Sequence, residues 1–300
     1  MSNMETADYG LVILNPAAGD EEPQEIVAAL QDVFGEDGYA LYKMSEDEPL
    51  CKAIARRLGE RNYAWVAAAG GDGTVSMVAD CLVGSEHKLA IIPAGTGNVL
   101  AQELGIPEDK DAACRLIKQH EQTRCIDAMR VGDRHYFLQV GMGLEALTMR
   151  ETPSSQKSRW GDLAYLWHAV KEGAEWQPHL LVLTIDGDRH EVEASEVVLA
   201  NAASIGMLGM SWGEAIVVDD GVIDVVVLQA RGPADYVAVL PSLLRGEEQD
   251  ADQVTIYRAR ESIRLETGQA LPLHGDGEVL KGPWPLEASV VSRAVSVIVP

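Results

Sequence analysis

The sequence predicts an α/β domain followed by a β-rich domain. Short apolar runs alternate with segments of helical apolar spacing in the first part of the chain. After about Cys125, strand-like runs dominate, and turn pairs such as Asp186-Gly187 and Asp220-Gly221 separate several of them. Alternating strands and helices favour a parallel sheet with helices on both faces. We therefore expect an α/β domain over residues 1–128 and a β-rich domain over 129–300, with the last strands free to return to the first domain.

In the first domain, each predicted strand is a buried apolar run followed by a helix. The strands are predicted at 11–14, 39–44, 63–69 and 89–92. Helices are predicted at 24–34, at 49–58 and at 109–120. Two more helices are predicted between them, one that begins at about residue 75 and one that ends at residue 104.

The second domain is predicted to consist mainly of strands. They are expected at 126–131, 135–140, 179–185, 197–202, 222–228, 253–257, 262–265, 290–291 and 295–299, with helices at 162–172 and 234–244.

Composition limits the classes of partner and compartment. The 300 residues carry a net charge of −23, which argues against nucleic acid as a partner and against long-lived adhesion to an anionic membrane. The start of the chain is polar, and no apolar run reaches membrane-spanning length, so we expect a cytoplasmic protein. The four cysteines show no close pairing in sequence and fit a reducing compartment, as small apolar side chains rather than metal ligands.

The stretch Gly70-Gly71-Asp72-Gly73-Thr74 joins a predicted strand to a predicted helix. Glycines allow a ligand close to the backbone, and the start of a helix offers free N–H groups to a phosphate. Asp72 would repel a phosphate unless a metal ion or a donor lies between them. This pattern indicates a site for a nucleotide with its metal.

Three other loops also follow predicted strands, at the edge where ligands bind in parallel sheets. They contain Asn15-Pro16 with Gly19, then Ser45, then Gly95-Thr96-Gly97-Asn98. A hydroxyl such as that of Thr96 can donate to a phosphate, and Asn98 can cap the following helix. Taken singly, each loop is explained as well by a turn or a helix cap, but four loops at one edge favour a nucleotide site.

The order of these motifs resembles the diacylglycerol kinase catalytic-domain family, which includes bacterial soluble lipid kinases and sphingosine kinases. The matching segments are Asn15 to Gly19, Gly70 to Thr74, Pro93 to Asn98, Val198 to Asn201, Asp219 to Val225 and Asp276-Gly277-Glu278. The resemblance implies a first domain with the fold of NAD kinases and 6-phosphofructokinases, and a β-sandwich second domain.

The resemblance also implies an ATP-dependent lipid kinase, with Mg-nucleotide in the cleft between the domains. Asp276 is then the general base for the lipid hydroxyl, Glu278 orients a metal ion or the substrate, and Asp72 holds Mg²⁺. Taken alone, Asp276-Gly277 would be a hairpin turn.

A second, structural Mg²⁺ is implied at Asp220, with the backbone carbonyls of Val217 and Val222 as further ligands. Family members often carry Asp or Thr where this chain has Val217. The resemblance therefore leaves open whether this site holds an ion. Asn98 is followed by Val99 where many bacterial members have Asp. This departure is closer to the sphingosine kinase pattern and leaves the lipid open.

Three readings of function remain. A lipid kinase would make transient membrane-surface contact, for which the basic and aromatic region 150–176 is suited; packing between the domains explains that region equally well. An NAD-kinase-like or other small-molecule kinase is the second reading, and a catalytically inactive nucleotide-binding regulatory protein is the third. The oligomeric state stays open, a homodimer included.

Overall fold

The computed structural model describes residues 9–16, 22–45, 47–143, 178–205, 209–247, 252–280 and 284–300. The chain forms two compact units, residues 1–126 with 293–300 (the α/β unit) and residues 127–292 (the β unit). Two strands, β5 (Gln122–Val131) and β16 (Leu286–Val299), run from one unit into the other. The segment 150–176 and the helix expected at 162–172 lie outside the described residues.

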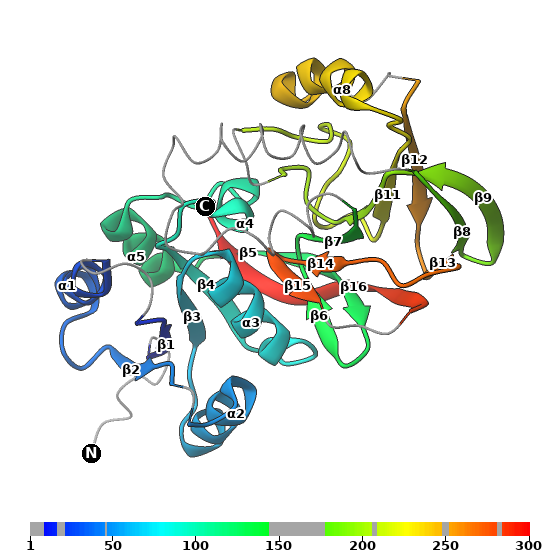
Figure 1. Cartoon of the computed structure of the whole chain (residues 1–300). Coiled ribbons are helices and arrows are strands. Elements are labelled where there is room, and N and C mark those ends of the chain that lie inside the picture. Colours follow the sequence, from blue (N-terminus) through cyan, green and yellow to red (C-terminus); the bar gives the residue numbers. More distant parts are fainter. Residues whose placement is uncertain are drawn as a thin grey trace. The chain divides into compact units, whose positions relative to one another are not determined.

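The α/β unit is built on a parallel sheet, as the sequence predicted (Figure 1). The strands lie in the order β2-β1-β3-β4, and Val297 of β16 pairs in parallel with Leu89. Their bounds are β1 Gly10–Leu14, β2 Tyr39–Lys43, β3 Trp65–Gly70 and β4 Lys88–Pro93. The helices are α1 Glu22–Phe34, α2 Leu50–Glu60, α3 Asp72–Leu82, α4 Val99–Glu103 and α5 Lys110–Gln119.

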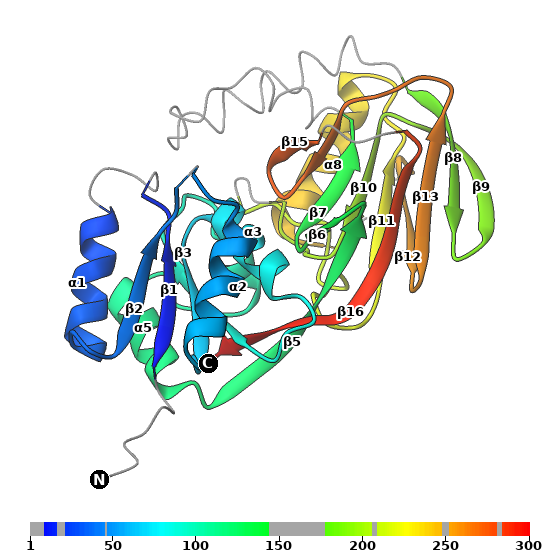
Figure 2. The same cartoon turned by 90° about the horizontal axis from the view of Figure 1, so that it is seen from below.

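Helices cover both faces of this sheet. Helices α1 and α5 lie on one face, and α2 and α3 on the other (Figure 2). Residues on one face of β1 and β3, such as Val12 and Ala67, pack against Ile26 of α1 and Ile117 of α5. Because neighbours on the other face are buried as well, β1 and β3 consist of continuous apolar residues rather than an alternating pattern.

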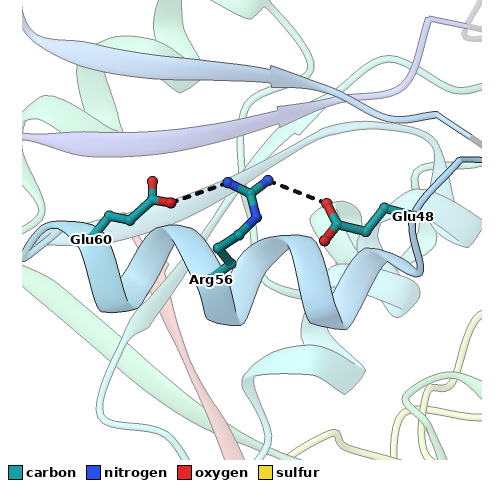
Figure 3. Close-up of polar contacts among 3 residues, drawn as sticks. All are labelled: Glu48, Arg56 and Glu60. Carbon is teal, nitrogen blue, oxygen red and sulfur yellow. Dashed lines mark hydrogen bonds and ion pairs between the residues drawn. The ribbon is translucent and has the colours of Figure 1, made fainter.

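The outer surface of α2 carries a small ion-pair network. Arg56 lies between Glu48 and Glu60, with 3.2 Å between the paired nitrogen and oxygen atoms on each side (Figure 3). All three side chains are substantially exposed to solvent. Pairs of this kind are screened by water and salt, so α2 owes its place chiefly to its buried face, which includes Ala53 and Ile54.

A disulfide joins α2 to α3, which the sequence did not predict. Cys51 in the first turn of α2 bonds Cys81 in the last turn of α3, with Cα atoms 4.8 Å apart across 30 positions of sequence. The expectation that no cysteines pair was therefore wrong: packing of two helices on one face of the sheet brings their opposite ends together. Cys114 and Cys125 are free, and burial raises the pKa of the Cys114 thiol to about 12.

The β unit consists of two antiparallel layers. One layer has the order β12-β11-β10-β7-β14-β15, and the other contains β16, β13, β8 and β9, with β6 paired to β5. Their bounds are β6 Arg134–Tyr136, β7 Gln139–Met142, β8 His179–Ile185, β9 Asp188–Ala194, β10 Glu196–Ala200, β11 Ile223–Leu228, β12 Val254–Ala259, β13 Ser262–Thr267, β14 Leu273–Gly275 and β15 Glu278–Leu280.

The core of the β unit lies between these two layers. Val225 and Val227 of β11 pack in one cluster with Leu183 of β8 and Leu265 of β13, which confirms the predicted β-sandwich. Helix α8 (Pro233–Arg245) covers the end of the six-stranded layer, where Val239 packs on Leu228 (Figure 1).

Several strands differ from the sequence prediction. The expected strand at 135–140 is two strands, β6 and β7, because the N–H groups of Phe137 and Leu138 donate to the Asp276 carboxylate. Strand β9 was missed because most of its residues are charged or polar. The two strands expected at the end of the chain are one long strand, β16. Within the described part of the chain, no helix has the length and apolar content to cross a membrane.

Candidate functional site

The two glycine-rich loops of the α/β unit touch each other through bare backbone. A Cβ built on Gly95 would lie 2.6 Å from the Cα of Gly71, and one built on Gly71 would lie 3.2 Å from the Cα of Gly95. The first distance is shorter than side chains tolerate, so Gly95 is required by this approach. The loop after β3 and the loop after β4 therefore form one surface, as the sequence predicted from their common edge.

Asp72 lies near the start of α4. The backbone N–H groups of Asn98, Val99 and Leu100 favour the charged form of its carboxylate. Burial raises the pKa of Asp72, and these N–H groups oppose that rise. The start of a helix favours a negative charge, so the Asp72 carboxylate suits a position near the start of α4.

Asn98 closes the second loop through its side chain. The carboxamide accepts a 2.9 Å hydrogen bond from the N–H of Gly95 and donates a 2.9 Å hydrogen bond to the Gly95 carbonyl. Asn98 lies in the left-handed region with φ 47°, and its side chain makes no capping bond to α4. Asn98 therefore fixes the turn from Gly95, and the expectation that its side chain caps α4 was wrong.

Asn15 reaches the start of α3. Its Nδ2 donates to Thr74 Oγ1 at 2.9 Å, and Thr74 is buried. A Cβ on Gly70 would lie 2.6 Å from that same oxygen, which explains the glycine there. The loop after β1 is thus tied to Gly70 to Thr74. Pro16, Ser45 and Thr96 are exposed, each just beyond a strand of the sheet, and Gly19 lies outside the described residues.

In the β unit, Asp276 is held by three consecutive backbone N–H groups. Oδ2 accepts from Phe137 at 2.8 Å, and Oδ1 accepts from Leu138 at 2.9 Å and Gln139 at 3.0 Å. Asp276 is 7% exposed and lies at φ 46° in the turn between β14 and β15. Its carboxylate is therefore fixed in position, with most of its lone pairs engaged.

Glu278 lies two residues further on, and its surroundings differ. Its side chain is 54% exposed, with Arg134 Nη1 3.7 Å from Oε2. His274, two residues before Asp276, is fully buried, and that burial lowers its pKa to about 4. The turn thus presents one fixed aspartate and one exposed glutamate.

The turn proposed to hold a structural ion contains Val217, Asp220 and Val222. Asp220 is exposed, and its Oδ1 accepts from the N–H of Val222 at 3.0 Å. The N–H of Gly221 donates to Asp127 Oδ2 at 2.7 Å, and the Val218 carbonyl accepts from the Asp127 N–H at 2.7 Å. The turn is thus closed by Asp127, a fully buried aspartate that the sequence reading did not single out.

These oxygens fit a tightly bound cation poorly. Mg²⁺ is usually held by carboxylates in octahedral oxygen coordination. Asp220 supplies one exposed carboxylate, one oxygen of which already accepts a backbone hydrogen bond. Among the described residues, no three His, Cys, Asp or Glu side chains gather in a metal-binding cluster.

Comparison with protein families accounts for both units. The model described as the diacylglycerol kinase catalytic domain matches residues 10–131, and the model described as the YegS C-terminal NAD kinase beta sandwich-like domain matches residues 138–299. The chain belongs to the diacylglycerol kinase catalytic-domain family. Membership of this family supports a kinase that acts on lipids.

Relatives in this family match most of the chain. A diacylglycerol kinase of Bacillus subtilis is 26% identical over 96% of this chain and 95% of its own length. A diacylglycerol kinase of Mycobacterium tuberculosis is 27% identical over 78% of this chain and 76% of its own length. An uncharacterized protein of Synechocystis is 26% identical over 97% of this chain and 70% of its own length.

A solved structure agrees in fold. The crystal structure of a diacylglycerol kinase from Bacillus anthracis superimposes with a TM-score of 0.74 at 20% identity, over 99% of this chain and 98% of that one. At that identity the likeness concerns the fold, and it supports the two-layer β unit and the parallel sheet described above.

Two residues of the β unit were missed as parts of the site. Asp127 is a single acid between the apolar residues Ile126 and Ala128, and the alternation of a strand would place it on the solvent face rather than in the core. Asn201 was noted only as a family match, and it proves to be fully buried with both amide hydrogens bonded to backbone carbonyls. Sequence spacing could not have shown that these two residues contact each other.

Proposed function

We propose that this protein transfers the γ-phosphate of Mg-ATP to a hydroxyl group of a lipid. The observation that carries the proposal is the turn Asp276-Gly277-Glu278, in which a carboxylate fixed by three N–H groups precedes an exposed carboxylate. An alcohol attacks a phosphate poorly unless a positioned base accepts its proton. The names of the relatives from Bacillus subtilis and Mycobacterium tuberculosis support a lipid as the acceptor.

The nucleotide is proposed to bind at the joined glycine loops of the α/β unit. Gly71 and Gly73 lie at the start of α3, and the backbone N–H groups at the start of a helix favour phosphate. Asn98 holds the neighbouring loop, which carries the exposed Thr96. Mg²⁺ enters as part of the Mg-nucleotide substrate and neutralises charge on the transferred phosphate.

The geometry favours an exchange of the roles expected for the two carboxylates of the β unit. Asp276 was expected to be the base, but N–H donors already bind both of its oxygens. Glu278 is exposed, and its only described charge partner is 3.7 Å away. We assign proton abstraction to Glu278 and the fixing of the turn to Asp276.

The chemical step balances with these groups. Glu278 accepts the proton of the lipid hydroxyl while the hydroxyl oxygen forms a bond to the γ-phosphorus. The bond between that phosphorus and the bridging oxygen of ADP breaks, which leaves ADP and a lipid phosphate.

Substrate, location and assembly are further parts of the proposal. The acceptor is diacylglycerol or a sphingoid-like lipid, reached from the cytoplasm by transient contact with a membrane surface. A net charge of −23 fits brief contact better than lasting adhesion to anionic lipid. A homodimer remains one of the assemblies compatible with this activity.

A radiolabelled transfer assay tests the function. Protein is incubated with γ-labelled ATP, Mg²⁺ and, separately, diacylglycerol, monoacylglycerol, phosphatidylglycerol, ceramide, a sphingoid base or NAD. Label on one lipid, lost in Glu278→Gln, supports the proposal. Label on NAD alone would establish an NAD-kinase-like enzyme, and nucleotide binding without transfer to any acceptor would favour a regulatory protein.

A further inference from the structure

We propose that Asn201 is a positioning residue for the Asp276-Gly277-Glu278 turn. The inference deepens the proposed function and rests on it for its kinetic consequence. Asn201 follows β10, is fully buried, and lies within a chain of hydrogen bonds that ends on the Asp276 carboxylate.

Asn201 and Asp276 bind opposite ends of the same peptide group. Asn201 Nδ2 donates to the Phe137 carbonyl at 2.8 Å. The N–H of that peptide belongs to Leu138, and it donates to Asp276 Oδ1 at 2.9 Å. A bond to the carbonyl of a peptide polarises its N–H, so the two hydrogen bonds strengthen each other.

The next peptide group repeats the arrangement through the backbone of Asn201. The Leu138 carbonyl accepts from the N–H groups of Asn201 and Ala202 at 2.9 and 3.1 Å. The N–H of the same peptide, that of Gln139, donates to Asp276 Oδ1 at 3.0 Å. Two consecutive peptides are therefore clamped between Asn201 on one side and Asp276 on the other.

The second amide hydrogen of Asn201 extends the network. It reaches the Asp127 carbonyl at 3.0 Å, and Asp127 Oδ2 accepts from the Gly221 N–H at 2.7 Å. Because both acceptors of the carboxamide are carbonyls, its nitrogen must face them, and an aspartate at this position would oppose them with oxygen. The residue type is thus fixed by the contacts, and so is the register between β10 and the 137–139 segment.

The consequence for catalysis follows from the rigidity of a site. The exposed Glu278 depends on the turn for its position, and the turn is held by Asp276. Loss of the Asn201 carboxamide would leave two buried carbonyls without their donor and free the 137–139 segment to move. A displacement of about 1 Å in a catalytic group costs roughly 100-fold in rate.

The kinetic test compares Asn201→Ala with Ser195→Ala. Ser195 is equally buried, and its hydroxyl donates to the Leu228 carbonyl and accepts from Ala230, on a path with no described bond to Asp276. Asn201→Ala is expected to lower kcat by roughly 10–100-fold with the KM for ATP unchanged, while Ser195→Ala keeps its kcat. In a Glu278→Gln background, Asn201→Ala should add little further loss. Wild-type kcat in folded Asn201→Ala, or equal losses in both variants, would overturn the inference.

A second measurement does not depend on activity, and its first part uses only the wild-type protein. In the wild-type protein, the amide hydrogens of Leu138 and Gln139 and the carboxamide hydrogens of Asn201 should exchange slowly with solvent. In Asn201→Ser, which keeps one hydroxyl donor, the Leu138 and Gln139 amide resonances should move upfield as their bonds to Asp276 weaken. Fast exchange of these hydrogens in the wild type would refute the clamp. Absence of lipid phosphorylation with the clamp intact would count against the proposed function alone.

Discussion

Gly95 faces the Cα of Gly71 so closely that a methyl group on Gly95 would lie 2.6 Å from it. The obstacle is backbone rather than the end of a flexible side chain, so it cannot move aside alone. The contact ties the loop after β3 to the loop after β4, and both loops carry residues proposed to bind the nucleotide phosphates.

Gly95→Ala should therefore separate the two loops. We expect a loss of about 1–3 kcal/mol in the free energy of unfolding, as for other overpacked sites, together with weaker nucleotide binding. Denaturant titration and calorimetric titration with Mg-ATP measure the two effects. Gly73→Ala is the control for stability, because nothing lies within 4 Å of its Cβ position and its φ is not left-handed. Equal stability of the Gly95→Ala and wild-type proteins would contradict the contact.

The sequence was sufficient for the α/β unit because its strands are continuous apolar runs and each ends in a loop with glycine or a small polar residue. Those features predict the parallel sheet and place four loops at one edge. They do not predict which group each loop side chain hydrogen-bonds. Asn98 was expected to cap α4, and its side chain instead bonds the backbone of Gly95.

The β unit was harder to predict because its polar contacts join distant parts of the chain. The strand expected at 135–140 is broken because Asp276, over 130 positions away, takes the N–H groups of residues 137–139. Nothing local marks that break. Strand β9 shows the opposite difficulty, since only Val192 and Ala194 of its seven residues are buried, too few for an apolar pattern.

The disulfide between Cys51 and Cys81 should be detectable by thiol counting. Unfolded without reductant, the protein should show two free thiols, from Cys114 and Cys125, and four after reduction. A crosslink across about 30 residues restricts the unfolded chain by roughly 3–4 kcal/mol, so Cys51→Ser should unfold at lower denaturant concentration. Four free thiols before reduction would show that the bond does not form. Equal stability of Cys51→Ser with and without dithiothreitol is the control.

The burial of His274 should make the folded protein less stable in mild acid. Burial lowers its pKa from 6.5 to about 4, so the folded protein keeps it neutral where the unfolded chain takes up a proton. Stability from this group is complete above pH 6.5 and is lost as the pH falls toward 4, by about 3 kcal/mol in all. The free energy of unfolding measured between pH 7 and 4 should fall less steeply in His274→Gln. Parallel slopes for the two proteins would exclude His274 as the cause.

The variants Asp276→Asn and Glu278→Gln should distinguish the roles of the two carboxylates of the turn. An asparagine offers one acceptor oxygen to the three N–H groups that Asp276 binds, so Asp276→Asn should destabilise the β unit by about 1–3 kcal/mol for each N–H left unsatisfied. Glu278 is exposed, so Glu278→Gln should change stability by less than about 0.5 kcal/mol while it lowers kcat by roughly 10²–10⁴-fold. Denaturant titration and transfer of labelled phosphate measure both quantities for each variant. If Glu278→Gln kept full kcat while a folded Asp276→Asn lost all transfer, the base would be Asp276 after all, and its three N–H bonds would have to rearrange when the lipid hydroxyl binds.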